Sequence, residues 1–294
     1  MIAQIVTGLS SGAAYALVAI GVVLVYKCTR ALSIAQGEIG AFGFLLGLRW
    51  ADRGVPGFGW HLPRFATLVV ALVVGAVIGL LVERFVMRPL VTRPPLDGLI
   101  ATLGVALVLA LAELQIFGTA QQNAPPAVGE WRLRVLGATL VSSRVVAIVV
   151  TAAVAGALYL FFTRTKFGLA VLATTSDPTV ARVLGVPVNQ VYRFAWVAGC
   201  ALAGVAAALL GPAFGGIAPF DLTRFTLRAL AGAVIGGLDS VWGAIAGSLI
   251  IGVVEAVVGS QVAAGGAETV AVLALVLLTL LVRPRGLFGA TAAA

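Results

Sequence analysis

The chain has few charged residues and few of the residues that carry out chemistry. Only 10% of its 294 residues are charged, and it contains one histidine and two cysteines. Cys28 and Cys200 lie in or beside apolar stretches without a paired spacing, so we expect neither a disulfide framework nor a metal site. The single histidine, His61, lies in a predicted outer loop, and the acidic residues are scattered along the chain. A membrane-embedded enzyme, which needs such groups clustered, is therefore disfavoured.

The common catalytic motifs are absent as well. The sequence has no HExxH helix and no glycine-rich loop with a Walker lysine. We therefore expect no enzyme activity and no cofactor in this chain. If ATP drives it, a partner protein has to bind the ATP and its magnesium ion.

Apolar residues are abundant instead. They make up 61% of the chain, and the mean hydropathy of +1.12 lies far above soluble-protein values. Nine apolar segments follow one another: Ile2 to Tyr26, Glu38 to Leu48, Phe65 to Phe85, Leu99 to Phe117, Val145 to Phe162, Phe194 to Leu210, Leu227 to Ile235, Val241 to Val258 and Thr269 to Val282. The first begins without a basic leader or cleavage site, so we expect it to be retained. The pattern predicts an all-α transmembrane bundle of eight or nine spans, with the two shortest segments forming broken or re-entrant helices.

The distribution of arginine and lysine predicts the orientation. An external N-terminus places 11 basic residues in the inner connections and 8 in the outer ones, which agrees with the positive-inside rule. Nine crossings then leave the C-terminus inside. The longest outer connection, Gly118 to Ser143, contains a segment around Arg132 that is suited to a short β-hairpin or strand.

The longest polar interruption lies near the middle of the chain, from Arg164 to Arg193. Asp177 is suited to cap a short helix, Pro178 to its first turn, and Gly185 to its end. We predict that this helix, with the small residue Ala181 on its surface and Leu184 at its end, docks a soluble partner.

A second polar break, from Ser33 to Glu38, follows the first apolar segment. A broken helix here would line a solute path, with Ser33, Gln36, Gly37 and Glu38 as candidate contacts. The structural alternative is an ordinary loop in which Ser33 caps a helix and Glu38 lies in the helix's first turn.

A third break surrounds Asp239 with glycines, between Gly236 and Gly247. It is either a second broken helix of the solute path or a tight turn followed by glycine-mediated helix packing. Glu113 and Glu255 fall within apolar segments, where charge is costly and suggests function. Alternatively, they lie near the ends of spans or pair with an arginine.

Five ordered motifs resemble a known family. They are Gly8 to Gly21, Ser33 to Glu38, Asp177 to Val186, Gly236 to Gly247 and Arg283 to Gly289. In this order they resemble permease subunits of branched-chain amino acid ABC importers, in particular the shorter of the two permeases. The family's first turn commonly reads Asn-Phe-Ala-His-Gly-Glu, and here Ser33, Ile34 and Gln36 replace three of its residues.

The resemblance implies a single permease domain over residues 1–289, with a disordered tail at 290–294, in the bacterial inner membrane. It implies a second permease as heterodimer partner, two cytoplasmic ATPases that grip the loop containing Asp177, Ala181, Leu184 and Gly185, and an external solute-binding protein. Related systems import urea or short amides, which gives an alternative substrate class. A stand-alone secondary transporter is the other alternative, with Asp239 and Glu255 as its only indications.

Overall fold

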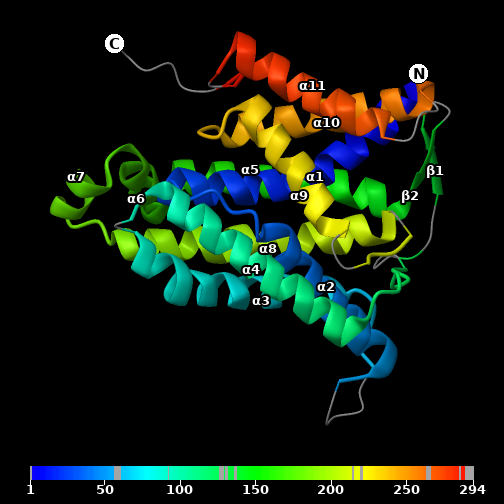
Figure 1. The fold of residues 1–294 in the computed structure, drawn as a ribbon, viewed down its shortest axis with the longest axis horizontal. Helices are drawn as coiled ribbons and strands as arrows, with labels where there is room; N and C mark the ends of the chain where they lie inside the picture. Colours follow the sequence, from blue (N-terminus) through cyan, green and yellow to red (C-terminus); the bar gives the residue numbers. More distant parts are fainter. Residues whose placement is uncertain are drawn as a thin grey trace.

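The computed structural model describes residues 2–55, 61–91, 93–125, 129, 132–135, 138–213, 215–218, 221–262, 266–284 and 286–288. These residues form a helical bundle (Figure 1). The helices are α1 (Ile2–Thr29), α2 (Gln36–Arg53), α3 (Ala66–Leu81), α4 (Pro95–Phe117), α5 (Ser142–Arg164), α6 (Lys166–Ser176), α7 (Pro178–Val183), α8 (Val188–Ala213), α9 (Asp221–Gly236), α10 (Val241–Gln261) and α11 (Ala267–Val282).

The predicted polytopic all-α fold is confirmed. Among the described residues, six helices are long and apolar enough to cross a membrane, namely α1, α3 with its short extension, α4, α5, α8 and α10. The remaining three apolar segments form α2, α9 and α11, with 18, 16 and 16 residues. Both α2 and α9 extend beyond their apolar runs, because polar residues continue each helix. The ends of the expected domain and tail lie outside the described residues.

The first helix forms the centre of the bundle. It packs against α8 and α10, and its side chains Tyr15, Leu17 and Ile20 are completely buried. Small residues allow this close approach, since a Cβ atom on Gly8 would lie only 2.6 Å from the carbonyl oxygen of Gly252 in α10. The backbones of α1 and α10 therefore touch along this seam.

The outer helices present apolar side chains. Leu107 of α4, Val149 of α5 and Leu277 of α11 are more than half exposed, as lipid-facing residues of a membrane protein would be. The bundle therefore contains a buried central helix surrounded by helices with an apolar outer surface.

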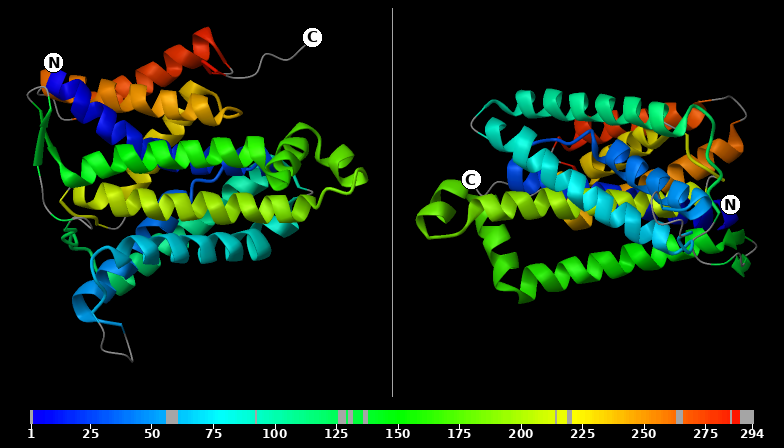
Figure 2. Two further views of the ribbon diagram at one scale, coloured as in Figure 1. Left: turned by 180° about the vertical axis from the view of Figure 1, so that it is seen from behind. Right: turned by 90° about the horizontal axis from the view of Figure 1, so that it is seen from below.

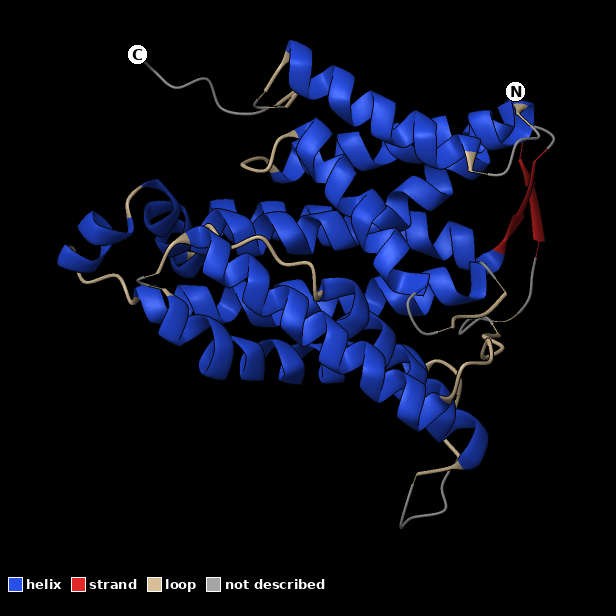
Figure 3. Cartoon of the chain, in the orientation of Figure 1, coloured by secondary structure: helices blue, strands red, loops and turns tan. Residues whose placement is uncertain are grey.

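A small hairpin projects at one end of the bundle (Figure 3). Strands β1 (Arg132–Val135) and β2 (Ala138–Val141) pair antiparallel, with Arg132 opposite Val141. This confirms the hairpin that the sequence predicts. Figures 1 and 2 place the hairpin and the first turns of α1 at the same end, and α6 and α7 at the opposite end. We refer to these as the hairpin end and the α7 end.

Candidate functional site

The segment between α5 and α8 forms two short helices at the α7 end. The Thr165 hydroxyl caps α6 by accepting a hydrogen bond of 2.9 Å from the Gly168 amide. The Asp177 carboxylate caps α7, accepting hydrogen bonds from the amides of Thr179 at 2.7 Å and Val180 at 3.0 Å. The helix start that the sequence predicts at Asp177 is confirmed, with Pro178 as its first residue.

The end of α7 is also fixed by its backbone. Gly185 has a φ of +83°, a conformation that suits glycine because it has no Cβ atom. Its amide donates to the Arg182 carbonyl at 3.1 Å, and the next amide, of Val186, donates to the Ala181 carbonyl at 3.0 Å. This pair of bonds is a Schellman motif, so α7 is held rigidly at both ends.

The exposed surface of α7 differs from the sequence prediction. Ala181 was expected on the partner-facing surface, but it is only 2% exposed because it packs inward onto residues of α1, α6 and α8. The exposed side chains are Val180, Val183 and Leu184, at 53%, 83% and 76%. A rigid six-residue helix thus presents an apolar tip beyond the bundle (Figure 2).

The segment from Arg30 to Glu38 links α1 to α2 and includes the first residues of α2. This link turns back into the bundle. Arg30 has a φ of +55° where the chain reverses direction, and Ser33, Gln36 and Glu38 are at most 2% exposed. Thr102 of α4 holds the link by donating to the Leu32 carbonyl at 3.3 Å. The sequence therefore located this break correctly.

The geometry at the start of α2 tests the alternative in which this break is an ordinary loop before a helix. The cap residue of α2 is Ala35, with no side-chain hydrogen bond, so the interpretation of Ser33 as a helix cap is wrong. Glu38 does lie in the first turn of α2, as that alternative predicts. The helix consequently begins inside the bundle, where the positive end of its dipole favours a carboxylate.

Gln36 is enclosed by two glycines. A Cβ atom on Gly21 of α1 would lie 3.1 Å from its Oε1 atom, and one on Gly199 of α8 would lie 3.0 Å from its Nε2 atom. Neither amide atom has a hydrogen-bond partner among the described residues. A buried amide without partners costs roughly 1 to 3 kcal/mol, which marks this position as unusual.

Two carboxylates meet next to this link, although the sequence gives no sign of their proximity. Glu38 accepts a hydrogen bond from the hydroxyl of Thr223 in the first turn of α9. The carboxyl group of Glu113, on α4, faces Glu38 and is completely buried. The helices α2, α4 and α9 thus bring together three polar groups that lie far apart in the chain.

Asp239 lies in the turn between α9 and α10, at the α7 end. It forms an ion pair of 3.0 Å with Arg30, and the two side chains are 46% and 58% exposed. The Ser240 hydroxyl caps α10, and the backbones of the two helices touch at Gly236 and Gly243. The tight turn with glycine packing, one of the two predicted alternatives, is the arrangement observed.

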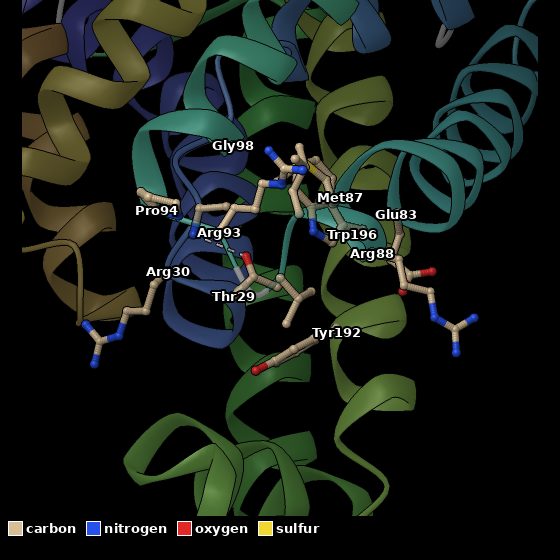
Figure 4. Close-up of a pocket in the computed structure, with 13 residues that line it drawn as sticks. Thr29, Arg30, Glu83, Met87, Arg88, Arg93, Pro94, Gly98, Tyr192 and Trp196 are labelled. Atoms are coloured by element: carbon tan, nitrogen blue, oxygen red, sulfur yellow. Dashed lines mark hydrogen bonds between the residues drawn. The ribbon is translucent and has the colours of Figure 1, made fainter.

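A basic cavity of about 250 Å³ lies near the same end (Figure 4). Arg30 and Arg88 lie on opposite sides of it, and Arg93, Met87 and Trp196 lie between them. One wall is the short π-helical turn that extends α3. Three arginine side chains thus lie close together at the α7 end of the bundle.

Glu255 of α10 is bound on both oxygens. Arg228 of α9 forms an ion pair with Oε1 at 2.9 Å, and the Tyr15 hydroxyl donates to Oε2 at 2.9 Å. The predicted alternative, pairing with an arginine, is therefore confirmed for this residue. The described residues contain no group of three or more possible metal ligands.

Comparison with known proteins decides the family. Residues 4–282 match the family described as branched-chain amino acid transport system / permease component. The chain belongs to this family. It is 32% identical to the high-affinity branched-chain amino acid transport system permease protein BraD of Pseudomonas aeruginosa, covering 97% of this chain and 95% of that protein. It is 30% identical to the corresponding protein LivH of Escherichia coli K12, covering 97% and 94%.

The fold agrees with that of a solved structure. The chain resembles PsaBC from Streptococcus pneumoniae in complex with Fab, with a TM-score of 0.51 over 97% of both chains at 16% identity. This likeness shows the fold alone. The family and the six long apolar helices indicate a multi-pass protein of the inner membrane. The relatives named above are transport proteins and not enzymes.

Proposed function

We propose that this chain is a permease subunit of an ATP-driven ABC importer for branched-chain amino acids. The observation that carries the proposal is α7, a helix capped at both ends whose apolar tip projects from a bundle that matches permeases over nearly its whole length. A rigid tip of this kind transmits the movement of a soluble partner to the helices behind it. The names of the relatives favour branched-chain amino acids over urea or short amides.

The partners follow from this role. Two cytoplasmic ATPases bind ATP and magnesium and grip the segment with Asp177, Ala181, Leu184 and Gly185. A second permease completes the path as a heterodimer partner, and an external solute-binding protein delivers the substrate. In this arrangement Ala181 anchors α7 to the bundle, and Leu184 contacts the ATPase.

The charge distribution supports an orientation with the α7 end in the cytoplasm. Lys27, Arg30, Arg88 and Arg93 lie at this end, as the positive-inside rule requires of the cytoplasmic side. The N-terminus and the hairpin then lie outside.

The buried link between α1 and α2 is our candidate for the moving part of the solute path. Ser33 and Gln36 have polar atoms without partners among the described residues, and Gly37 and Glu38 contact α9. A second conformation that exposes these polar atoms to water or substrate would give them hydrogen-bond partners. The buried and the exposed conformations of the link are therefore close in free energy. Asp239, at the exposed α7 end, would face the exit of that path.

Purification tests the proposal directly. The chain, tagged and extracted from its native membrane in mild detergent, should retain ATPase subunits and a longer permease, and the complex should hydrolyse ATP. A stable complex without an ATPase would contradict the coupling role of α7. It would favour the stand-alone transporter instead.

A further inference from the structure

A cavity of about 490 Å³ opens between α9 and the first half of α11. Part of its lining is apolar, from Leu227 and Ala231 of α9 and from Val272 and Leu273 of α11. The remainder includes two arginines and one carboxylate. Ligand sites of this kind combine apolar walls with a few polar groups that fix the orientation of the ligand.

The charges in this cavity are not neutralised by one another. Arg228 is held by Glu255 at 2.9 Å, and its guanidinium lies 5.8 Å from the centroid of the Phe225 ring. Arg224 and Glu268, in contrast, form no ion pair or hydrogen bond with any described residue, although both line the cavity. Arg224 is exposed and Glu268 is half-buried, and each lies near the start of its helix, so both charges are open to a ligand that enters the cavity.

A neighbouring cavity of about 440 Å³ extends this site toward α1. Glu268 and Glu255 line it together with hydroxyl groups of Thr7, Ser11 and Tyr15. Glu268 therefore lines both cavities. The cavity of about 490 Å³ contains the arginines, and the cavity of about 440 Å³ contains the hydroxyl groups. The two cavities together contain two positive side chains, Arg224 and Arg228, and two negative ones, Glu255 and Glu268. Arg224 and Glu268 are the two that form no ion pair with a described residue.

We propose that the cavity between α9 and α11 binds a zwitterionic aliphatic amino acid. Arg224, beside the fixed Arg228, receives the carboxylate of the amino acid, Glu268 receives its ammonium group, and the apolar walls receive its side chain. A zwitterion supplies one charge of each sign, which matches the two unpaired side chains. This inference rests on the proposed function and adds to it a site within the permease itself, distinct from the Ser33 to Glu38 link.

The test measures binding of radiolabelled leucine to the purified complex, without the solute-binding protein and without nucleotide. Leucine should compete at least about tenfold better than leucinamide, which lacks the carboxylate, and better than 4-methylpentanoate, which lacks the ammonium group. Equal competition by all three compounds overturns the proposal. This measurement uses the unaltered protein, so it does not depend on the folding of a variant.

Two substitutions then assign the groups. Arg224→Gln should remove the preference for leucine over leucinamide and leave the preference over 4-methylpentanoate, whereas Glu268→Gln should do the reverse. Asp52→Asn, an exposed acid at the end of α2 that lies outside both cavities, is the matched control and should change neither. If both preferences survive both substitutions, the assignment is wrong.

The outcome separates this inference from the proposed function. Complexes that import leucine with ATP but show no preference among the three compounds would overturn only the site. A complex that hydrolyses ATP and imports a different class of solute would overturn the proposed substrate.

Discussion

Arg228 of α9 and Glu255 of α10 form an ion pair of 2.9 Å in which both side chains are largely buried, at 20% and 15% exposure. The Tyr15 hydroxyl of α1 donates to the second oxygen of the same carboxylate. Three helices are thus joined by one polar cluster. Within the membrane, where water does not replace lost partners, such a cluster specifies how the helices pack.

Removal of one member of this pair should destabilise the fold. Glu255→Ala leaves the Arg228 charge without its partner, and we expect a loss of about 3 kcal/mol in the free energy of unfolding. Unfolding can be followed with a thiol-reactive dye, because both cysteines are at most 4% exposed. The double variant Arg228→Leu with Glu255→Leu is the control and should lose less than Glu255→Ala. A larger loss in the double variant would show that the pair itself stabilises the fold.

The seam between α1 and α10 should not tolerate a side chain larger than glycine. A Cβ atom on Gly12 would lie 2.8 Å from the Ser248 carbonyl oxygen, so Gly12→Ala forces the backbones apart and should cost about 2 kcal/mol. Gly104→Ala on α4 is the matched control, since a Cβ atom there meets nothing within 4 Å. We expect it to be neutral or stabilising by up to about 1 kcal/mol. Equal effects of both substitutions in the thiol assay would contradict the packing described.

The apolar tip of α7 should be needed for coupling. Leu184→Asp places a charge in the proposed contact with the ATPase, and we expect loss of about 2 kcal/mol of binding, seen as loss of ATPase from the purified complex. The residue is 76% exposed, so the permease itself should still fold and insert. Gln190→Glu, an exposed polar position at the start of α8, is the control and should retain the ATPase. Retention by both variants would exclude Leu184 from the interface.

The α1 to α2 link should affect transport without affecting assembly. Gln36→Leu removes an amide that has no partner among the described residues, so we expect stability to be kept or increased. Uptake should slow, because the proposed second conformation loses its polar contact, while the ATPases still co-purify. Unchanged uptake kinetics would show that the link has only a structural role.

Local sequence signals predicted the local structure well. Asp177, Pro178 and Gly185 specify the ends of α7 through caps that involve only neighbouring residues. The hairpin near Arg132 likewise depends on nearby residues, and so does the turn at Asp239, which the sequence left as one of two alternatives. These features are therefore readable from the chain itself.

Contacts between distant segments were not predictable in this way. The approach of Glu38 to Glu113 depends on how α2 and α4 cross, and no periodicity encodes that crossing. The burial of Ala181 depends similarly on packing against α1 and α8. The unpaired charges of Arg224 and Glu268 face one cavity only because α9 and α11 lie side by side. Tertiary packing, and not local propensity, sets each of these relationships.

The most direct test of the central claim is leucine uptake into proteoliposomes that contain the complete assembly. We predict accumulation of leucine only when ATP is supplied at the α7 side and the solute-binding protein at the hairpin side, with no accumulation when a non-hydrolysable ATP analogue replaces ATP. Leucine uptake by this chain alone, driven by an ion gradient without ATP, would contradict the account and identify a stand-alone transporter.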